Sequence, residues 1–296
     1  MTTALLILLA VIAVALIFEY INGFHDTANS IATVVATKVL TPRQAVVLAA
    51  GMNLLGALAG TAVAKTISSG LIDTNVVAVG SGVLICALTG GIIWNLITWW
   101  LGLPSSSSHA LVGGLCGAAV AAAHGDFGAL IWSQTAGDWT QNKGILWKVV
   151  MPMISSPVAG FTLGILIMGT FMAVISTMNG AGGWMARVSR PRWVNAIFGK
   201  AQIASAAYMG FAHGTNDAQK TMGIIALAIF GAEASGTLND LPTWLSFLHP
   251  NGQEGDIDTW IVFACAIVMA LGTAAGGWRI IKTLGHKLVK RHSIDG

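Results

Sequence analysis

Long runs of apolar residues alternate with short polar clusters along the whole chain. A transmembrane helix needs about 17 to 25 predominantly apolar residues. Stretches of this length or longer lie at residues 3–22, 42–65, 76–103, 105–124, 148–177, 194–212 and 259–277. The pattern therefore predicts an all-α polytopic membrane protein.

Two further apolar stretches, residues 27–40 and 218–232, are too short to span a membrane unaided. Each one follows a polar cluster, at residues 22–26 in the first case and 213–217 in the second. Short helices entered through polar, glycine-containing breaks are typical of the broken helices of secondary transporters. We therefore expect the backbone to leave the helical path at both clusters.

The composition agrees with a membrane protein. Hydrophobic residues make up 55% and charged residues 9% of the 296 positions, and the mean hydropathy is +0.74. The net charge of +3 is too small to indicate a nucleic-acid partner, so the expected surroundings are a lipid bilayer. The three cysteines lie singly in apolar segments, without disulfide or metal-ligand spacing, and no resident metal or other cofactor is predicted.

Charge in the connecting segments predicts the orientation. Lys38 and Arg43 follow the first short apolar stretch, further arginines lie in residues 187–192, and Lys and Arg crowd residues 279–291. The positive-inside rule places these three regions in the cytoplasm, whereas residues 233–258 contain acidic residues but no Lys or Arg. We therefore expect a first repeat with its following spans at residues 1–178, a cytoplasmic basic loop at 179–193, and a second, inverted repeat at 194–296.

The two polar clusters also resemble each other. Aligning "GFHDTANSIA" with "GTNDAQKTMG" pairs Gly23 with Gly214, His25 with Asn216, Asp26 with Asp217, and Asn29 with Lys220. Few residues are identical, but the opposite orientation of the two clusters supports a repeat. Inverted-topology repeats place a binding site near the membrane midplane, at the interface of the two halves.

A third polar element is "LPSSSSHALVGG", residues 103–114. Pro104 ends one span, Ser105, Ser106, Ser107 and Ser108 open the next, and His109 follows one turn into the helix. A helix N-terminus presents unpaired backbone N–H groups, so hydroxyl-rich helix starts suit anions. The alternative is that the serines only cap the helix and pack closely.

The motifs "NGFHDTANSIATV", "GLPSSSSHALVGG", "SPVAGF" and "HGTNDAQKTMGII", in this order, resemble the inorganic phosphate transporter (PiT) family, most closely its bacterial low-affinity members. The resemblance implies a symporter in the bacterial plasma (inner) membrane that carries inorganic phosphate with a cation. It implies that Asp26 and Asp217 hold the coupling ion, with His25 and Asn216 beside them. It also implies that the four serines hold phosphate, with Asn29 and Lys220 as further candidates.

The nature of the coupling ion depends on His25. A carboxylate at the bilayer centre costs at least about 2.5 kcal/mol, so Asp26 and Asp217 are expected to bind a cation or a proton. The usual family signature has Asn at the position of His25, and a histidine with a reference pKa near 6.5 can carry a proton. We therefore favour H⁺ over Na⁺. The resemblance further implies that phosphate travels as a neutral complex with a divalent metal.

Three other groups are candidates for a proton relay: Glu19, His109 and His213. Each has a structural alternative, because a lone histidine in a helix is more often satisfied by its neighbours and Glu19 could be an interfacial carboxylate. Lys220 could pair with Asp217 instead of with phosphate.

The chain departs from the family pattern near its C-terminal end. The family continues there into a second Ser/Thr-rich helix start, which this sequence lacks. We therefore expect an incomplete second repeat, which an oligomeric neighbour could complete. Alternatives are Na⁺-coupled phosphate transport, sulfate transport, an intramembrane metallohydrolase and a truncated remnant that does not transport. The absence of an HExxH-type motif argues against the hydrolase.

Overall fold

The structure is a computed structural model that describes residues 2–60, 71–73, 76–77, 79–135, 142–180, 190–239, 241–250 and 256–276. Its α-helices are α1 (Thr3–Ala36), α2 (Pro42–Leu58), α3 (Ser81–Leu101), α4 (Ser107–Ala122), α5 (Met151–Gly180), α7 (Pro191–Ala234) and α8 (Thr259–Ala275). Short helical turns are η2 (Phe127–Ala129), the π-helical η4 (Leu146–Val150) and η5 (Thr243–Leu248). The described helices that are long and apolar enough to cross a membrane are Thr3–Ala36, Ser81–Leu101 and Leu146–Met178. The all-α membrane class is therefore confirmed.

The polar clusters at residues 22–26 and 213–217 lie inside continuous helices. α1 runs unbroken through the first cluster over 34 residues, and α7 runs through the second over 44 residues, which makes them about 51 and 66 Å long. The predicted breaks at these clusters are wrong. The glycines in the clusters allow neighbouring backbones to approach and do not interrupt the helix.

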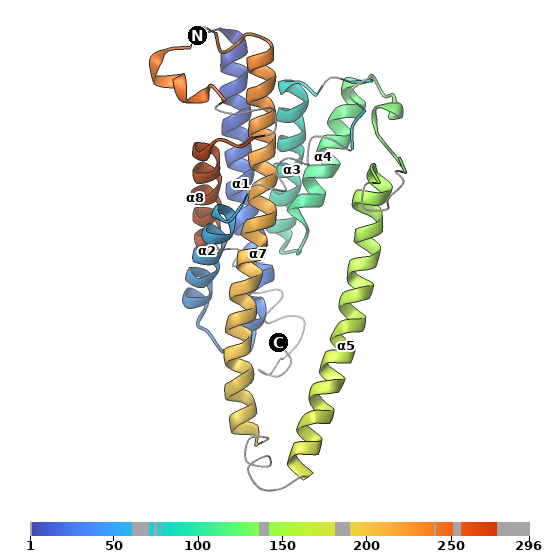
Figure 1. Cartoon of the computed structure of the whole chain (residues 1–296), viewed down its shortest axis with the longest axis vertical. Helices are drawn as coiled ribbons and strands as arrows, with labels where there is room; N and C mark the ends of the chain where they lie inside the picture. Colours follow the sequence, from blue (N-terminus) through green and yellow to red (C-terminus); the bar gives the residue numbers. More distant parts are fainter. Residues whose placement is uncertain are drawn as a thin grey trace.

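α1 and α7 cross the molecule in opposite directions (Figure 1). α1 packs against α8, the next α-helix after α7, and α7 packs against α2, the next α-helix after α1. A Cβ atom at any of four glycines would collide with a backbone carbonyl oxygen of the neighbouring helix. The pairs are Gly23 with Met269, Gly272 with Tyr20, Gly214 with Asn53, and Gly56 with Phe211. The first two pairs join α1 to α8 and the last two join α7 to α2. On every helix the carbonyl lies three residues before the glycine. These reciprocal contacts support the predicted inverted repeat.

α3 and α4 form a hairpin whose tip lies beside the middle of α1 and α7 (Figure 1). Gly102 ends α3 with a left-handed φ of 70°, which a residue with a side chain rarely adopts. Ser106 caps α4 by accepting a hydrogen bond from the backbone N–H of His109. The span expected at 105–124 is thus α4, which begins at the level of the polar clusters.

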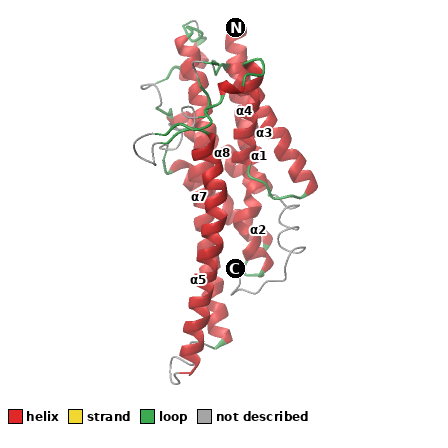
Figure 2. Cartoon of the chain, turned by 90° about the vertical axis from the view of Figure 1, so that its right-hand side faces the viewer, coloured by secondary structure: helices red, strands yellow, loops and turns green. Residues whose placement is uncertain are grey.

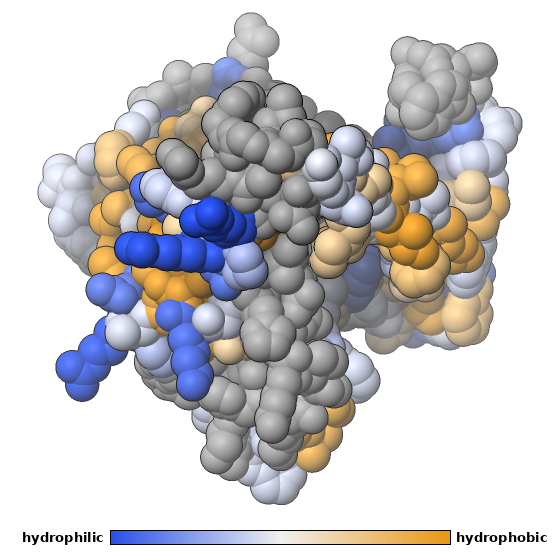
Figure 3. Space-filling view, turned by 90° about the horizontal axis from the view of Figure 1, so that it is seen from below, coloured by the Kyte–Doolittle hydropathy of each residue, from blue (hydrophilic) through white to orange (hydrophobic). Residues whose placement is uncertain are grey.

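α5 stands apart from the other long helices in Figure 1, and Figure 2, turned by 90°, shows it as one continuous helix. None of its described side chains is buried, and Phe161 is 72% exposed. A helix that is apolar on all sides is typical of a membrane span. Figure 3 shows hydrophilic side chains projecting beside hydrophobic surface on the lower end of the molecule. Lys38, Arg43, Arg190 and Arg192 are exposed and lie near the ends of their helices in the sequence. Most of the basic loop at 179–193 and the basic residues after 276 lie outside the described residues.

The helix contact at Gly214 yields a stability prediction. We expect Gly214→Ala to lower the melting temperature of the detergent-purified protein, because the added methyl group would clash with the α2 backbone at Asn53 and overpacking costs about 1 to 3 kcal/mol. Gly160→Ala in α5 is the matched control, since a Cβ atom there meets nothing within 4 Å. Equal melting temperatures of the two variants would contradict this packing.

Candidate functional site

A cavity of about 500 Å³ lies between the middle of α1, the hairpin tip and the middle of α7. Its lining residues are Asp26, Asn29, Ser30, Pro104, Ser105, Ser106, Met209, His213 and Asp217. Segments from both predicted repeats and the serine-rich element therefore meet at one place, as expected from the sequence. The cavity is thus lined by hydroxyl groups, two carboxylates and an imidazole.

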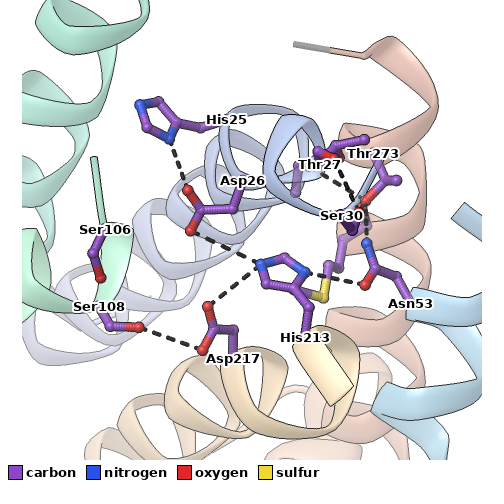
Figure 4. A network of polar contacts seen from close by, with 12 residues as sticks. His25, Asp26, Thr27, Ser30, Asn53, Ser106, Ser108, His213, Asp217 and Thr273 are labelled. Carbon is purple, nitrogen blue, oxygen red and sulfur yellow. Dashed lines mark hydrogen bonds and ion pairs between the residues drawn. The ribbon is translucent and has the colours of Figure 1, made fainter. Parts of the chain in front are cut away.

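Asp26 is buried and forms a pair with His25 (Figure 4). Nδ1 of His25 lies 2.9 Å from Oδ1 of Asp26, and its Nε2 lies 3.0 Å from Oγ1 of Thr98 on α3. The Thr98 hydroxyl can donate its single hydrogen to the backbone carbonyl of Trp94 or Asn95, at 3.0 and 3.1 Å. If it does so, Nε2 of His25 donates to the Thr98 oxygen; if the hydroxyl donates to Nε2 instead, the hydrogen of a neutral His25 lies on Nδ1. In both arrangements a hydrogen lies between Nδ1 and Asp26, because two lone pairs would repel each other at 2.9 Å.

His213 on α7 is held in the same manner. Its Nδ1 lies 3.0 Å from Oδ1 of Asn53, and the Asn53 amide NH₂ donates to Oγ1 of Thr273 at 2.8 Å. Thr273 in turn donates to the carbonyl of Met269 at 2.9 Å, which fixes the orientation of the amide. Nδ1 of His213 is therefore a donor, and its Nε2 faces the cavity.

Nε2 of His213 lies between the two aspartates. It is 3.4 Å from Oδ2 of Asp217 and 3.9 Å from Oδ2 of Asp26 (Figure 4). His213 and Asp217 are four residues apart on a continuous helix, which places them on one face. A proton on Nε2 would link the carboxylate of one predicted repeat to that of the other.

Lys220 supplies the positive charge beside Asp217. Its ammonium group donates to Asp217 and to Oγ of Ser108, and the Ser108 hydroxyl also lies 3.3 Å from Oδ1 of Asp217. The ion-pair alternative for Lys220 therefore fits the structure. Lys220 is not among the residues that line the cavity, but its ammonium contacts Asp217 on the cavity wall.

The four serines divide between different surroundings. Ser105 and Ser106 line the cavity, Ser105 donates to Thr98 at 3.1 Å, and Ser106 caps α4. Ser108 contacts α7, and Ser107 is fully buried away from the cavity. The capping interpretation therefore holds for Ser106, and anion binding by the serines that line the cavity stays a prediction.

The structure separates other candidates from this network. Asn29 lines the cavity but is exposed. Asn216 and His109 are exposed, and their side chains make no hydrogen bond within the described part of the chain. Glu19 is fully buried and accepts a hydrogen bond from Thr221 outside the cavity.

The sequence did not predict a role for two residues of the network, Thr98 and Asn53. Each is a single polar residue in an apolar span, and this isolated polarity is the only feature of the sequence that points to a role. Without the helix pairing, nothing in the sequence connected them to the histidines of other segments.

Asn53 should control the protonation of His213. We expect Asn53→Ala to move the pH of half-maximal phosphate uptake down by roughly one unit, because a hydrogen bond to a charged group contributes about 1.5 to 3 kcal/mol and 1.36 kcal/mol corresponds to one pH unit. The measurement is uptake into proteoliposomes as a function of pH. Asn239→Ala, at an exposed position, should leave the profile unchanged, and an unshifted profile for Asn53→Ala would rule out this role.

Comparisons with known proteins agree with the geometry. Residues 22–296 match the phosphate transporter family. The chain is 42% identical to a probable low-affinity inorganic phosphate transporter of Bacillus subtilis, over all of this chain and 77% of that protein. It is also 42% identical to a protein of the same description from Mycobacterium bovis, over 98% of this chain and 60% of the relative.

A solved structure described as the sodium-dependent phosphate transporter shares the fold, with a TM-score of 0.72 over 98% of this chain and 80% of the other. Its sequence identity is 20%, so the likeness concerns the fold alone. The family relatives are transporters, which argues against the metallohydrolase alternative, and the bacterial relatives support a location in the plasma membrane. The chain belongs to the phosphate transporter family.

Proposed function

We propose that the chain carries inorganic phosphate across the bacterial plasma membrane together with protons. The observation that carries this proposal is the pair of histidines, His25 and His213, whose outer nitrogens are held by Thr98 and Asn53 while their inner nitrogens face carboxylates. Each inner nitrogen is thereby a site for one exchangeable proton.

Electrostatics can couple these protons to phosphate. Asp26, Asp217 and Lys220 together carry a net charge of −1 when both histidines are neutral, and protonation of His25 and His213 changes the net charge of the group to +1. In a buried site this reversal strongly favours an anion. Phosphate would bind against Ser105 and the start of α4, and its release would favour release of the protons.

A second form of the substrate is a metal–phosphate complex. Asp26, His213 and Asp217 each offer a ligand atom, and these atoms lie within 4.8 Å of one another. Carboxylate oxygens and imidazole nitrogen bind divalent cations. A metal at Nε2 of His213 would replace its proton, so metal-bound phosphate and the fully protonated site are mutually exclusive.

The test is uptake of radiolabelled phosphate by the full chain in proteoliposomes. An inward proton gradient should drive accumulation above equilibrium, and a Na⁺ gradient at constant pH should not. Excess sulfate should leave uptake unchanged, whereas competition by sulfate would support the sulfate alternative. Uptake that follows Na⁺ and ignores pH would overturn proton coupling, and absence of uptake under both gradients would support the non-transporting alternative.

A further inference from the structure

The turn between α1 and α2 packs against α7 far from the cavity. Val39 of the turn contacts α7 at Gly199, where a Cβ atom would lie 3.8 Å from Cγ2 of Val39. Oγ1 of Thr37 lies 2.8 Å from Oε1 of Gln202, three residues farther along α7. These two contacts hold the turn, which belongs to the first predicted repeat, against the first helix of the second repeat. We call this place the turn–α7 junction.

Three basic residues belong to the segments that meet at the turn–α7 junction. Lys38 is the middle residue of the contacting turn, Lys200 directly follows the contact on α7, and Arg43 is the second residue of α2. All three are exposed, and none of them forms an ion pair among the residues that the structure describes. The sequence contains no Asp or Glu at residues 27–72 or 139–216. The described part of the junction therefore carries positive charge without a compensating carboxylate.

The backbone of Lys38 has a conformation that residues with a side chain rarely adopt. Its φ is 59°, in the left-handed region that is open to glycine without steric cost. Glycine is the usual residue in this conformation just after a helix, and α1 ends at Ala36. Unfavourable conformations that persist are often associated with function. What Lys38 adds in place of glycine is a long cationic side chain, and its structural alternative is a favourable interaction with the C-terminal end of α1.

The turn–α7 junction lies at the depth of lipid headgroups. In an inverted repeat Asp26 and Asp217 lie near the membrane midplane, and Lys38 is twelve residues beyond Asp26, which corresponds to about 18 Å. The hydrocarbon core ends about 15 Å from the midplane, and the headgroups extend to about 20 to 22 Å. Lys200 lies at the level of the turn because it follows the contact on α7. Arg192 lies about 12 Å farther along α7, beyond the headgroups.

We propose that Lys38, Arg43 and Lys200 bind the phosphate headgroup of an anionic phospholipid on the face predicted to be cytoplasmic. Basic pockets between transmembrane helices on this face bind anionic lipid headgroups, and ammonium and guanidinium groups donate to phosphate oxygens. Because Lys38 and Arg43 come from the first repeat and Lys200 from the second, one headgroup links the two repeats. Inorganic phosphate presents the same chemical group, so the test includes both ligands.

The test is the melting temperature of the full chain, freed of lipid in a neutral detergent and titrated with phosphatidylglycerol or phosphatidylcholine. Saturating phosphatidylglycerol should raise it by roughly 2 to 4 °C more than phosphatidylcholine, because a ligand of the folded state stabilises that state. Each basic residue near an anionic lipid surface strengthens binding by about fivefold. Lys38→Gln and Lys200→Gln should therefore each need about fivefold more phosphatidylglycerol for half of the rise.

Two matched variants remove the same charge elsewhere. Arg192→Gln changes an exposed residue on the same side of the membrane but beyond the headgroups, and Lys148→Gln changes an exposed residue just before the upper end of α5 (Figure 1). Both should keep the response of the unmodified chain. Lys38→Gly removes the charge and the unfavourable conformation together, so it should raise the melting temperature without lipid and still weaken the response to phosphatidylglycerol.

Three results would overturn the proposal. The first is an equal response to phosphatidylglycerol and phosphatidylcholine. The second is an equal loss of response in Lys38→Gln and Arg192→Gln, which would indicate general attraction to a basic surface. The third is an unchanged response in Lys38→Gln with a lower melting temperature without lipid, which would leave Lys38 with a role at the end of α1 only. Inorganic phosphate alone should stabilise Lys38→Gln and Lys200→Gln as much as the unmodified chain, and a loss of that stabilisation would make free phosphate the ligand instead.

Discussion

Asp217→Asn should reduce phosphate uptake into proteoliposomes by at least about 100-fold. Asp217 lies on the cavity wall and contacts Lys220, Ser108 and His213. Removing one partner of a buried ion pair costs about 3 to 5 kcal/mol, and each 1.36 kcal/mol is a factor of ten in rate. The measurement is initial uptake under a fixed inward proton gradient, normalised to the amount of reconstituted protein.

Two further variants separate charge balance from a direct role in coupling. Glu233→Gln removes an exposed carboxylate of the same helix and should keep the uptake of the unmodified chain. The double variant Asp217→Asn with Lys220→Met removes both charges of the pair and should restore protein stability but not uptake. Recovery of uptake in the double variant would show that Asp217 only neutralises Lys220.

The sequence predicted that the two polar clusters meet, but not that the backbone stays helical through both of them. Asp26 and Asp217 were expected at one site because inverted repeats place a binding site at the interface of the two halves, and the resemblance to the phosphate transporter family added the serines. The alignment of Asp26 with Asp217 paired His25 with Asn216. Adjacent residues of a continuous helix point about 100° apart, and Asn216 is exposed whereas Asp217 lines the cavity.

If a continuous helix had been expected here, its spacing would have grouped His213 with Asp217. His213 is four residues before Asp217, and Lys220 is three residues after it, so all three share one face of the helix. The sequence pattern alone could not decide between a break and a continuous helix, because glycine occurs both at helix breaks and where neighbouring helices approach closely. The difference lies in the close approach of α2 at Gly214, which is a tertiary contact.

The supporting residues were harder to predict for a related reason. Asn53 and Thr98 act across helix interfaces, and their partners lie 160 and 73 positions away in the chain. Isolated polar residues in apolar spans are common, and only the register of the packed helices shows which of them face a histidine. The serine run illustrates the same limit, since Ser108 contacts α7 whereas the adjacent Ser107 is buried without a side-chain hydrogen bond among the described residues.

The two protonatable histidines are not equivalent, although each faces a carboxylate. His25 is 1% exposed and contacts Asp26 at 2.9 Å, whereas His213 lines the cavity and is shared between two carboxylates at longer distances. His213 is therefore accessible to the substrate and to a metal, and His25 is accessible only through Asp26. We therefore expect His25 to carry its proton both when the substrate is free phosphate and when it is the metal–phosphate complex.

His25→Asn should therefore uncouple one proton and leave phosphate binding intact. Asn is close in size and can still hydrogen-bond Asp26 or Thr98, but it has no exchangeable proton near neutral pH. Each coupled proton multiplies the limiting accumulation ratio by ten per pH unit, so a gradient of one unit should accumulate about tenfold less phosphate in the variant. Exchange of phosphate across the membrane at equal pH should remain within about twofold of the unmodified chain.

The control for this prediction is His249→Asn, at a histidine that is 46% exposed and paired with Glu233. It should show the full accumulation and the full pH dependence. If His25→Asn kept the same accumulation ratio at every imposed gradient, the proton would have to bind elsewhere, with His213 as the remaining site. If it lost exchange at equal pH as well, His25 would serve to position Asp26 for phosphate binding, since exchange at equal pH needs binding but no proton gradient.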